Sequence, residues 1–363
     1  MKAVVYPYDF EFASVLKHRE MLKNLEIVFL TAPKGFGTCS KDAYCFYGKE
    51  SGFTICDIWD KNSYSDVDTL LIIDSVLKIP KEERLAELGN VISSKLLVIN
   101  LVYDSEFIID LENICKKQEA KLMSGFELLE DKNQISLSNV GIPSELNRIN
   151  TPIVAICGLS PMTQKFDLQL YFRDYFMKDG YKVSQIGTRD MGYLFGFHSW
   201  GDALYTNCFS ETEKIAKINQ FVKDIELVEN PDIFIIGIPD ALIPYTQKHT
   251  FRYGIPAFEI LNAITPDYMV MSLFNGEYTN EFYEEMIKMC NYKYNADVDC
   301  FFNSHFVPIS RSINSDHLSY SYGNRLTAKS EKYSVFNSES IDDRDMYECV
   351  VNKLVNYGKF KAY

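Results

Sequence analysis

The stretch from Gly158 to Lys165 has the residue types of a loop that binds phosphate. An apolar run over 151–157 comes before the glycine, and an amphipathic pattern begins at Lys165. A strand that ends in a turn of backbone N–H groups, followed by the positive end of a helix and a lysine, stabilises an oxyanion. Lys165 and the N–H groups from Gly158 through Ser160 to Thr163 are therefore predicted to hold the phosphates of ATP or GTP.

Two residues of this stretch depart from the usual pattern. Position 164 is Gln, although glycine there lets the backbone close around phosphate without a side chain in the way. Phe166 stands where a Ser or Thr hydroxyl would bind magnesium, so the metal lacks its usual ligand. The prediction is an anion or nucleotide site without that magnesium contact. The alternative is an ordinary turn between strand and helix, with a solvated lysine.

Two further segments are candidate parts of the same site. Asp240 follows an apolar run, and a carboxylate at the end of a strand is placed to orient water or a metal ion. Arg189 and His198 lie in the segment 186–200, whose three glycines allow it to fold over a ligand. We predict that Arg189 contacts the cofactor and that Asp240 and His198 are catalytic. The alternatives are a turn aspartate and a structural histidine.

Charge and composition exclude several classes of partner. The 363-residue chain has 50 acidic and 37 basic residues, a formal net charge of −13, which disfavours nucleic acid. It has no basic amphipathic stretch, no apolar run of ~18 residues and no export signal, so no membrane is expected and the predicted location is cytoplasmic. The nine cysteines show neither CxxC nor zinc-ligand spacing, so no metal site is predicted.

Alternating strand and helix patterns predict an α/β protein with two doubly wound, mainly parallel-sheet domains. Ser210 and Glu213 form a capping box at the start of one helix. The predicted domains are a Rossmann-like domain over 1–125, a linker or short extra elements over 126–150, and a P-loop NTPase-like domain with a C-terminal extension over 151–363. Strands are predicted over 2–8, 25–31, 52–59, 67–74, 95–102, 151–158, 181–190 and 231–241, and mixed elements over 268–275 and 298–310. Helices are predicted over 11–25, 80–94, 105–120, 165–180, 210–230, 279–290 and 343–360, with a loop or extended edge over 310–345.

Four segments resemble a known family: "YPYDFEF", "KGFGTCSKD", "GLSPMTQKFDLQL" and "IGTRDMGYLFGFHS". The family is that of peptide maturation system proteins, found beside radical-SAM enzymes that modify Cys-rich ribosomal peptides in anaerobic bacteria. The segment "KFDLQL" is also similar to the "GKFTLQ" helix start of a group of P-loop proteins, at Lys165, Phe166, Leu168 and Gln169. The resemblance implies a role in making a ribosomally synthesised, modified peptide.

Three functions follow as alternatives. The first is an accessory protein that binds the precursor peptide or the radical-SAM maturase and is gated by a nucleotide. The second is an ATP- or GTP-dependent ligase or kinase that acts on the peptide. The third is a non-catalytic interaction scaffold, in which the loop is inert. Assembly into a homo-oligomer is compatible with all three.

Overall fold

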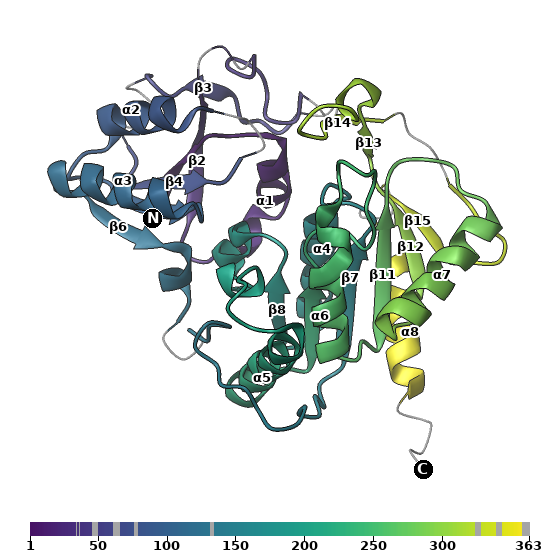
Figure 1. Ribbon diagram of the computed structural model, residues 1–363. Helices are drawn as coiled ribbons and strands as arrows, with labels where there is room; N and C mark the ends of the chain where they lie inside the picture. Colours follow the sequence, from purple (N-terminus) through teal and green to yellow (C-terminus); the bar gives the residue numbers. More distant parts are fainter. Residues whose placement is uncertain are drawn as a thin grey trace. The chain divides into compact units, whose positions relative to one another are not determined.

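The computed structural model describes residues 1–357 except 34, 36, 46–49, 61–65, 76–78, 131–133, 324–327 and 339–342. The fold is α/β and falls into two compact units, each built around a parallel sheet (Figure 1). Unit 1 comprises Met1–Gln134 with Asp190–Gly196, and unit 2 comprises Ile135–Arg189 with Phe197–Tyr363. Among the residues described, no helix has the length and apolar character needed to cross a bilayer.

Unit 1 contains a six-stranded sheet with the order β3-β2-β1-β4-β5-β6, and its strand pairings are parallel. This is the strand order of a Rossmann fold, which confirms the prediction of a Rossmann-like fold in the N-terminal part. Helices α2 and α3 pack against one face through Leu88, Phe107 and Leu111. The elements are β1 Lys2–Tyr6, β2 Glu26–Ala32, β3 Ile55–Asp57, β4 Thr69–Ile73, α2 Lys81–Val91, β5 Leu97–Leu101, α3 Ser105–Lys117 and β6 Lys121–Ser124.

The long helix predicted over 11–25 is wrong. The chain instead forms the short 3-10 helix η1 (Phe10–Phe12), helix α1 (Ala13–Lys17) and the 3-10 helix η2 (Arg19–Met21). Helix α1 already buries Val15 and Leu16, and the chain must then extend to reach β2. The segment "KGFGTCSKD" between β2 and β3 includes Lys34 and Phe36, which lie outside the described residues.

Unit 2 contains a seven-stranded sheet with the order β15-β12-β11-β7-β10-β8-β9, again with parallel pairings. Strand β7, which precedes the predicted phosphate loop, is central, with β10 on one side and β11 on the other. Edge strand β15 lies in the segment predicted to be loop or extended edge. The strands are β7 Ile153–Gly158, β8 Val183–Gly187, β9 His198–Ser199, β10 Ile233–Gly237, β11 Tyr268–Leu273, β12 Cys300–Asn303 and β15 Val335–Asn337.

Helices cover both faces of this second sheet (Figure 1). Successive strand residues point to opposite faces, so Val154 and Ile156 pack with α4 and α8, while Ala155 and Cys157 belong to the core beneath α5, α6 and α7. The doubly wound arrangement predicted for this part of the chain is therefore present. The helices are α4 Lys165–Lys178, α5 Glu211–Glu229, α6 Ile255–Ala263, α7 Asn280–Tyr294 and α8 Asp345–Tyr357.

Helix α6 and the hairpin of β13 (Phe306–Pro308) and β14 (Tyr320–Tyr322) in unit 2 were not predicted. Helix α6 has buried residues around most of its circumference, so it lacks the amphipathic period by which surface helices are recognised. The hairpin pairs β13 antiparallel with β14. Its strands are three residues long and separated by a polar segment, which is too little for a pattern.

The predicted capping box at the start of α5 is present. The side chain of Ser210 accepts the N–H of Glu213, and Glu213 Oε2 accepts the N–H of Ser210 at 2.8 Å. We expect Ser210→Ala to lower the free energy of unfolding by about 1 kcal/mol, because the N–H of Glu213 loses its side-chain acceptor and Glu213 Oε2 loses the hydroxyl donor of Ser210. Urea denaturation measures the change. Ser210→Asp, which keeps a capping oxygen, is the control, and unchanged stability in the alanine variant would contradict the role of the cap.

Candidate functional site

The predicted phosphate loop lies where the strand order of unit 2 reverses. From β7 the chain passes through α4 to strands on one side of β7, and only later reaches β11, β12 and β15 on the other side. The loop that leaves the carboxyl end of β7 therefore stands at the topological switch point. Open α/β sheets bind their ligands at such points.

Among the described residues, most backbone N–H groups of this loop have no acceptor. The N–H of Leu159 donates to the carbonyl of Ser272 at 3.0 Å, which holds the start of the loop against β11. The following N–H groups surround one turn at the positive end of a 14-residue helix, an arrangement that stabilises an oxyanion. In the described part of the chain, no acceptor exists for the N–H groups of Ser160, Met162, Thr163, Gln164 and Lys165.

The side chain of Lys165 is buried and folded back over the turn. Its Nζ donates to the carbonyl oxygen of Ser160 at 2.8 Å and to that of Asp240 at 2.5 Å. A Cβ on Gly158 would lie 3.2 Å from Lys165 Cδ, so glycine leaves room for the lysine stem. Burial lowers the pKa of Lys165 from 10.5 to about 7. The positive charge of Arg189 lowers this pKa further, whereas the negative charge of Asp240 raises it. The amine is thus a desolvated donor beside the turn.

Gln164 has the backbone conformation that the usual pattern assigns to glycine. Its φ of 60° and ψ of 25° are left-handed, a region that costs a residue with a Cβ roughly 1–2 kcal/mol. The side chain leaves the turn, because Oε1 accepts the N–H of His305 at 2.6 Å and Nε2 donates to Asp167 Oδ2 at 3.5 Å. The turn therefore keeps a glycine-like shape although a larger residue occupies the position.

The usual magnesium ligand is absent from the loop. Phe166 is 5% exposed, and its ring centroid lies 6.2 Å from that of Phe197. The two hydroxyl groups of the loop are already bonded: Thr163 Oγ1 donates to the carbonyl of Ser160 at 3.2 Å, and Ser160 Oγ lies 3.1 Å from Tyr320 Oη. Within the described residues, no group of three or more His, Cys, Asp or Glu could hold a metal ion.

Asp240 and Arg189 lie beside the loop. Asp240 follows β10 with a left-handed φ of 56°, and its Oδ2 is buried without a hydrogen-bond partner among the described residues. Burial raises the pKa of Asp240, and the positive charges of Lys165 and Arg252 oppose the shift. Arg189 donates from Nη2 to Met162 Sδ at 3.3 Å. The structure thus brings both residues to the edge of the sheet where the loop lies.

His198 is held elsewhere in unit 2. Its Nε2 lies 2.7 Å from Glu229 Oε1, and its ring packs edge-on against Phe221 at 6.1 Å. Burial alone would raise the pKa of Glu229, but hydrogen bonds from His198 and Ser184 and the charge of Arg173 hold it below its ordinary value. None of the described contacts of His198 involves the phosphate loop. The structure therefore does not bring this predicted catalytic residue to Lys165.

Arg252 was not among the predicted site residues, although its positive charge opposes the rise in the pKa of Asp240. Phe251, Arg252 and Tyr253 have φ values of 44°, 54° and 57°, three successive left-handed residues that each have a Cβ. The guanidinium carbon of Arg252 lies 4.1 Å from the ring centroid of Tyr205. Such strain is found at ligand sites, where surrounding contacts hold it in place. No residue pattern predicts it, because left-handed turns are usually marked by glycine or asparagine.

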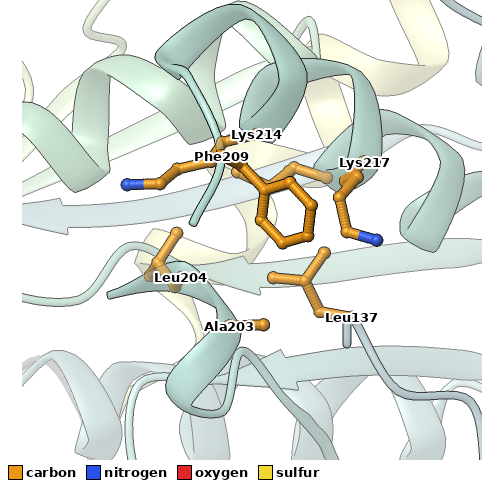
Figure 2. A pocket seen from close by; sticks show the side chains of 7 residues that line it. Leu137, Ala203, Leu204, Phe209, Lys214 and Lys217 are labelled. Atoms are coloured by element: carbon orange, nitrogen blue, oxygen red, sulfur yellow. The ribbon is translucent and has the colours of Figure 1, made fainter. Parts of the chain in front are cut away.

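A small pocket lies elsewhere on unit 2 (Figure 2). Its empty space of about 190 Å³ includes open solvent. Figure 2 shows the side chains of Leu137 and Leu204 beside the ring of Phe209, and the amine of Lys217 lies 4.9 Å from the centroid of that ring. Lys217 Nζ donates a hydrogen bond to the carbonyl oxygen of Val140. The lining residues are Leu137, Ala203, Leu204, Phe209, Lys214, Lys217 and Ile218, none of them in the phosphate loop.

A solved structure has a fold similar to that of this chain. A DUF1611 family protein from Anabaena variabilis ATCC 29413 has a TM-score of 0.55 at 13% identity, over 84% of this chain and 87% of that one. The A chain of dipicolinate synthase from Bacillus subtilis is 14% identical over 84% of this chain and 88% of its own, but its TM-score of 0.22 carries no argument. No family model and no curated protein matches the sequence. At these identities the comparison supports the fold alone, an α/β chain with Rossmann-like domains.

Proposed function

We propose that unit 2 is a P-loop NTPase-like domain that binds the phosphate groups of ATP or GTP at the loop from Gly158 to Lys165. This proposal is carried by the turn of N–H groups that find no acceptor in the described part of the chain, beside a buried lysine. The position of the loop after a central parallel strand and before a helix supports it.

The interactions of Lys165 explain why an anion would be held. In the free protein its amine contacts two neutral carbonyl oxygens, those of Ser160 and Asp240. A phosphate group would add negative charge beside the amine, and two unit charges 4 Å apart attract by about 4 kcal/mol at an effective dielectric constant of 20. Arg189, whose charge already lowers the pKa of Lys165, would be neutralised by the same ligand.

The role that we propose for this binding is accessory. The protein would bind the precursor peptide or the radical-SAM maturase during maturation of a ribosomally synthesised, post-translationally modified peptide, and nucleotide occupancy would gate the interaction. Support for the peptide comes from the sequence resemblance at the four segments quoted above. Support for an accessory role comes from Phe166, because metal-assisted phosphoryl transfer needs a ligand at that position.

A second candidate function is an ATP- or GTP-dependent ligase or kinase that acts on the peptide. The unpartnered Oδ2 of Asp240 favours it, since a buried carboxylate beside a phosphate site is placed to accept a proton from an attacking group. Such an enzyme would need magnesium from a geometry in which the loop hydroxyls change partners.

Nucleotide binding should not depend on magnesium. We expect ATP and GTP to bind equally well in EDTA and in magnesium chloride, because the contacts are to N–H groups and Lys165. Titration calorimetry measures the affinity, and phosphate release is followed with and without a Cys-rich precursor peptide. Binding without turnover supports the accessory role, and peptide-stimulated release supports the enzyme. If neither nucleotide binds, the result supports the third function, a non-catalytic interaction scaffold.

A further inference from the structure

The β13–β14 hairpin is joined to both ends of the phosphate loop. Tyr320 Oη, from β14, lies 3.1 Å from Ser160 Oγ near the start of the loop. The N–H of His305, just before β13, donates to Gln164 Oε1 at the end of the loop. These partners are separated by 160 and 141 residues in the sequence. The hairpin therefore meets the turn on two sides.

Aromatic contacts hold the hairpin in this position. The His305 ring stacks on Tyr322 at 4.8 Å and 27°, and Phe306 packs edge-on against the same ring. At the other strand, the ring centroids of Tyr320 and Phe274 are 6.1 Å apart. The N–H of Asn275 donates to the carbonyl of Phe306 at 2.9 Å, which ties the hairpin to the end of β11. The hydroxyl of Tyr320 is therefore placed by packing and not only by Ser160.

We propose that this hairpin forms a wall of the anion site, in which Tyr320 donates a hydrogen bond to a phosphate oxygen and Gln164 fastens the hairpin to the loop. The inference rests on the proposed phosphate binding. A ligand oxygen that accepts the N–H of Ser160 lies about 2.9 Å from that nitrogen. The Tyr320 hydroxyl is one hydrogen bond from the side chain of the same residue, so it reaches the same oxygen or its neighbour.

This arrangement also accounts for the departure at position 164. Glycine would adopt the left-handed backbone without strain, but it has no side chain to accept the N–H of His305. Gln164 keeps the loop shape and adds the connection. Phosphate that enters the turn draws Tyr320 onto the ligand while Gln164 holds the other side, so occupancy of the loop tightens the hairpin.

The first test compares Tyr320→Phe with a matched control, Tyr322→Phe. Both variants lose a hydroxyl from β14, and the ring that stacks on His305 belongs to Tyr322 and is kept. We expect Tyr320→Phe to weaken both ATP and inorganic phosphate about tenfold, since one hydrogen bond to a charged group is lost. Tyr322→Phe should bind as the wild type does. Equal affinities in all three proteins overturn the inference, and a loss confined to ATP overturns it too, by placing Tyr320 at the nucleoside.

The second test follows hydrogen exchange of the Phe306–Tyr322 amides. In the wild type, saturating ATP should slow their exchange, and in Gln164→Ala this protection should be lost although ATP still saturates the protein. Unchanged exchange in the wild type with ATP bound overturns the coupling. If the wild type binds neither ATP nor inorganic phosphate, the proposed nucleotide site itself fails, which is distinguishable from a site that binds without the hairpin.

Discussion

Lys165→Met should weaken binding of ATP, GTP or inorganic phosphate by about 100-fold or more. The substitution removes a buried ammonium group that stands against the turn of N–H groups, and a hydrogen bond to a charged group contributes roughly 1.5–3 kcal/mol before the Coulomb attraction is added. Methionine has a similar length and no charge, so it fills the space beside Gly158. Calorimetry or equilibrium dialysis measures the affinity.

The same variant should be more stable than the wild type at pH 6. Burial lowers the pKa of Lys165 to about 7, so at pH 6 the folded protein contains a desolvated charge that methionine removes. The two carbonyls that lose their donor reduce this gain. Lys178→Met is the matched control, because this lysine is exposed at the end of the same helix and pairs with Asp174 at the surface. It should change neither phosphate affinity nor stability appreciably. Wild-type affinity in Lys165→Met would refute the site.

Phosphate-site affinity should fall as pH rises above about 7. In the free protein the pKa of Lys165 is lowered to about 7, so at higher pH the amine is mostly neutral and must take up a proton when an anion binds. The affinity should then drop up to about tenfold per pH unit, and it should be level below pH 7. Sulfate is the suitable probe because its charge is constant in this range. Calorimetry at pH 8 in buffers of different ionisation enthalpy should show uptake of one proton.

Lys165→Arg tests the origin of this pH dependence. Arginine stays charged throughout the range, so the variant should show a much flatter profile. The lowered pKa also makes the stability of the free protein rise with pH between about 7 and 10.5, because the unfolded chain binds the additional proton there. Lys165→Met should lack this rise. A flat sulfate profile from pH 7 to 9 in the wild type would show that the amine is not part of the anion site.

The architecture followed from local patterns. Continuous apolar runs such as 153–157 and 233–236 must be buried on both faces, and only a parallel sheet between helices provides this. The capping box at Ser210 was equally readable, because both of its hydrogen bonds join residues three apart. The helix expected over 11–25 failed for a complementary reason. Its apolar spacing was local, but the distance to β2 decided where the helix ends.

Much of the candidate site was also predictable. Gly158, Lys165 and Asp240 follow apolar runs, and the carboxyl ends of parallel strands meet at one edge of the sheet. The same reasoning predicts that Arg189 lies beside the loop, and its Nη2 donates to Sδ of Met162 in the loop. His198 also comes after a strand that ends at this edge, but it lies in β9, where its side chain contacts Glu229. Proximity to a strand end does not decide which way a side chain points.

By itself, the sequence determined the α/β class, the parallel sheets covered by helices and the loop at which a ligand is expected. The tertiary structure alone decided that Gln164 takes a left-handed backbone, that the charge of Arg252 acts on Asp240 and that Tyr320 meets Ser160. The physical reason is range. The spacing of apolar residues and the helix caps involve residues close in the chain. These features instead depend on contacts between segments as much as 160 residues apart, which no local pattern records.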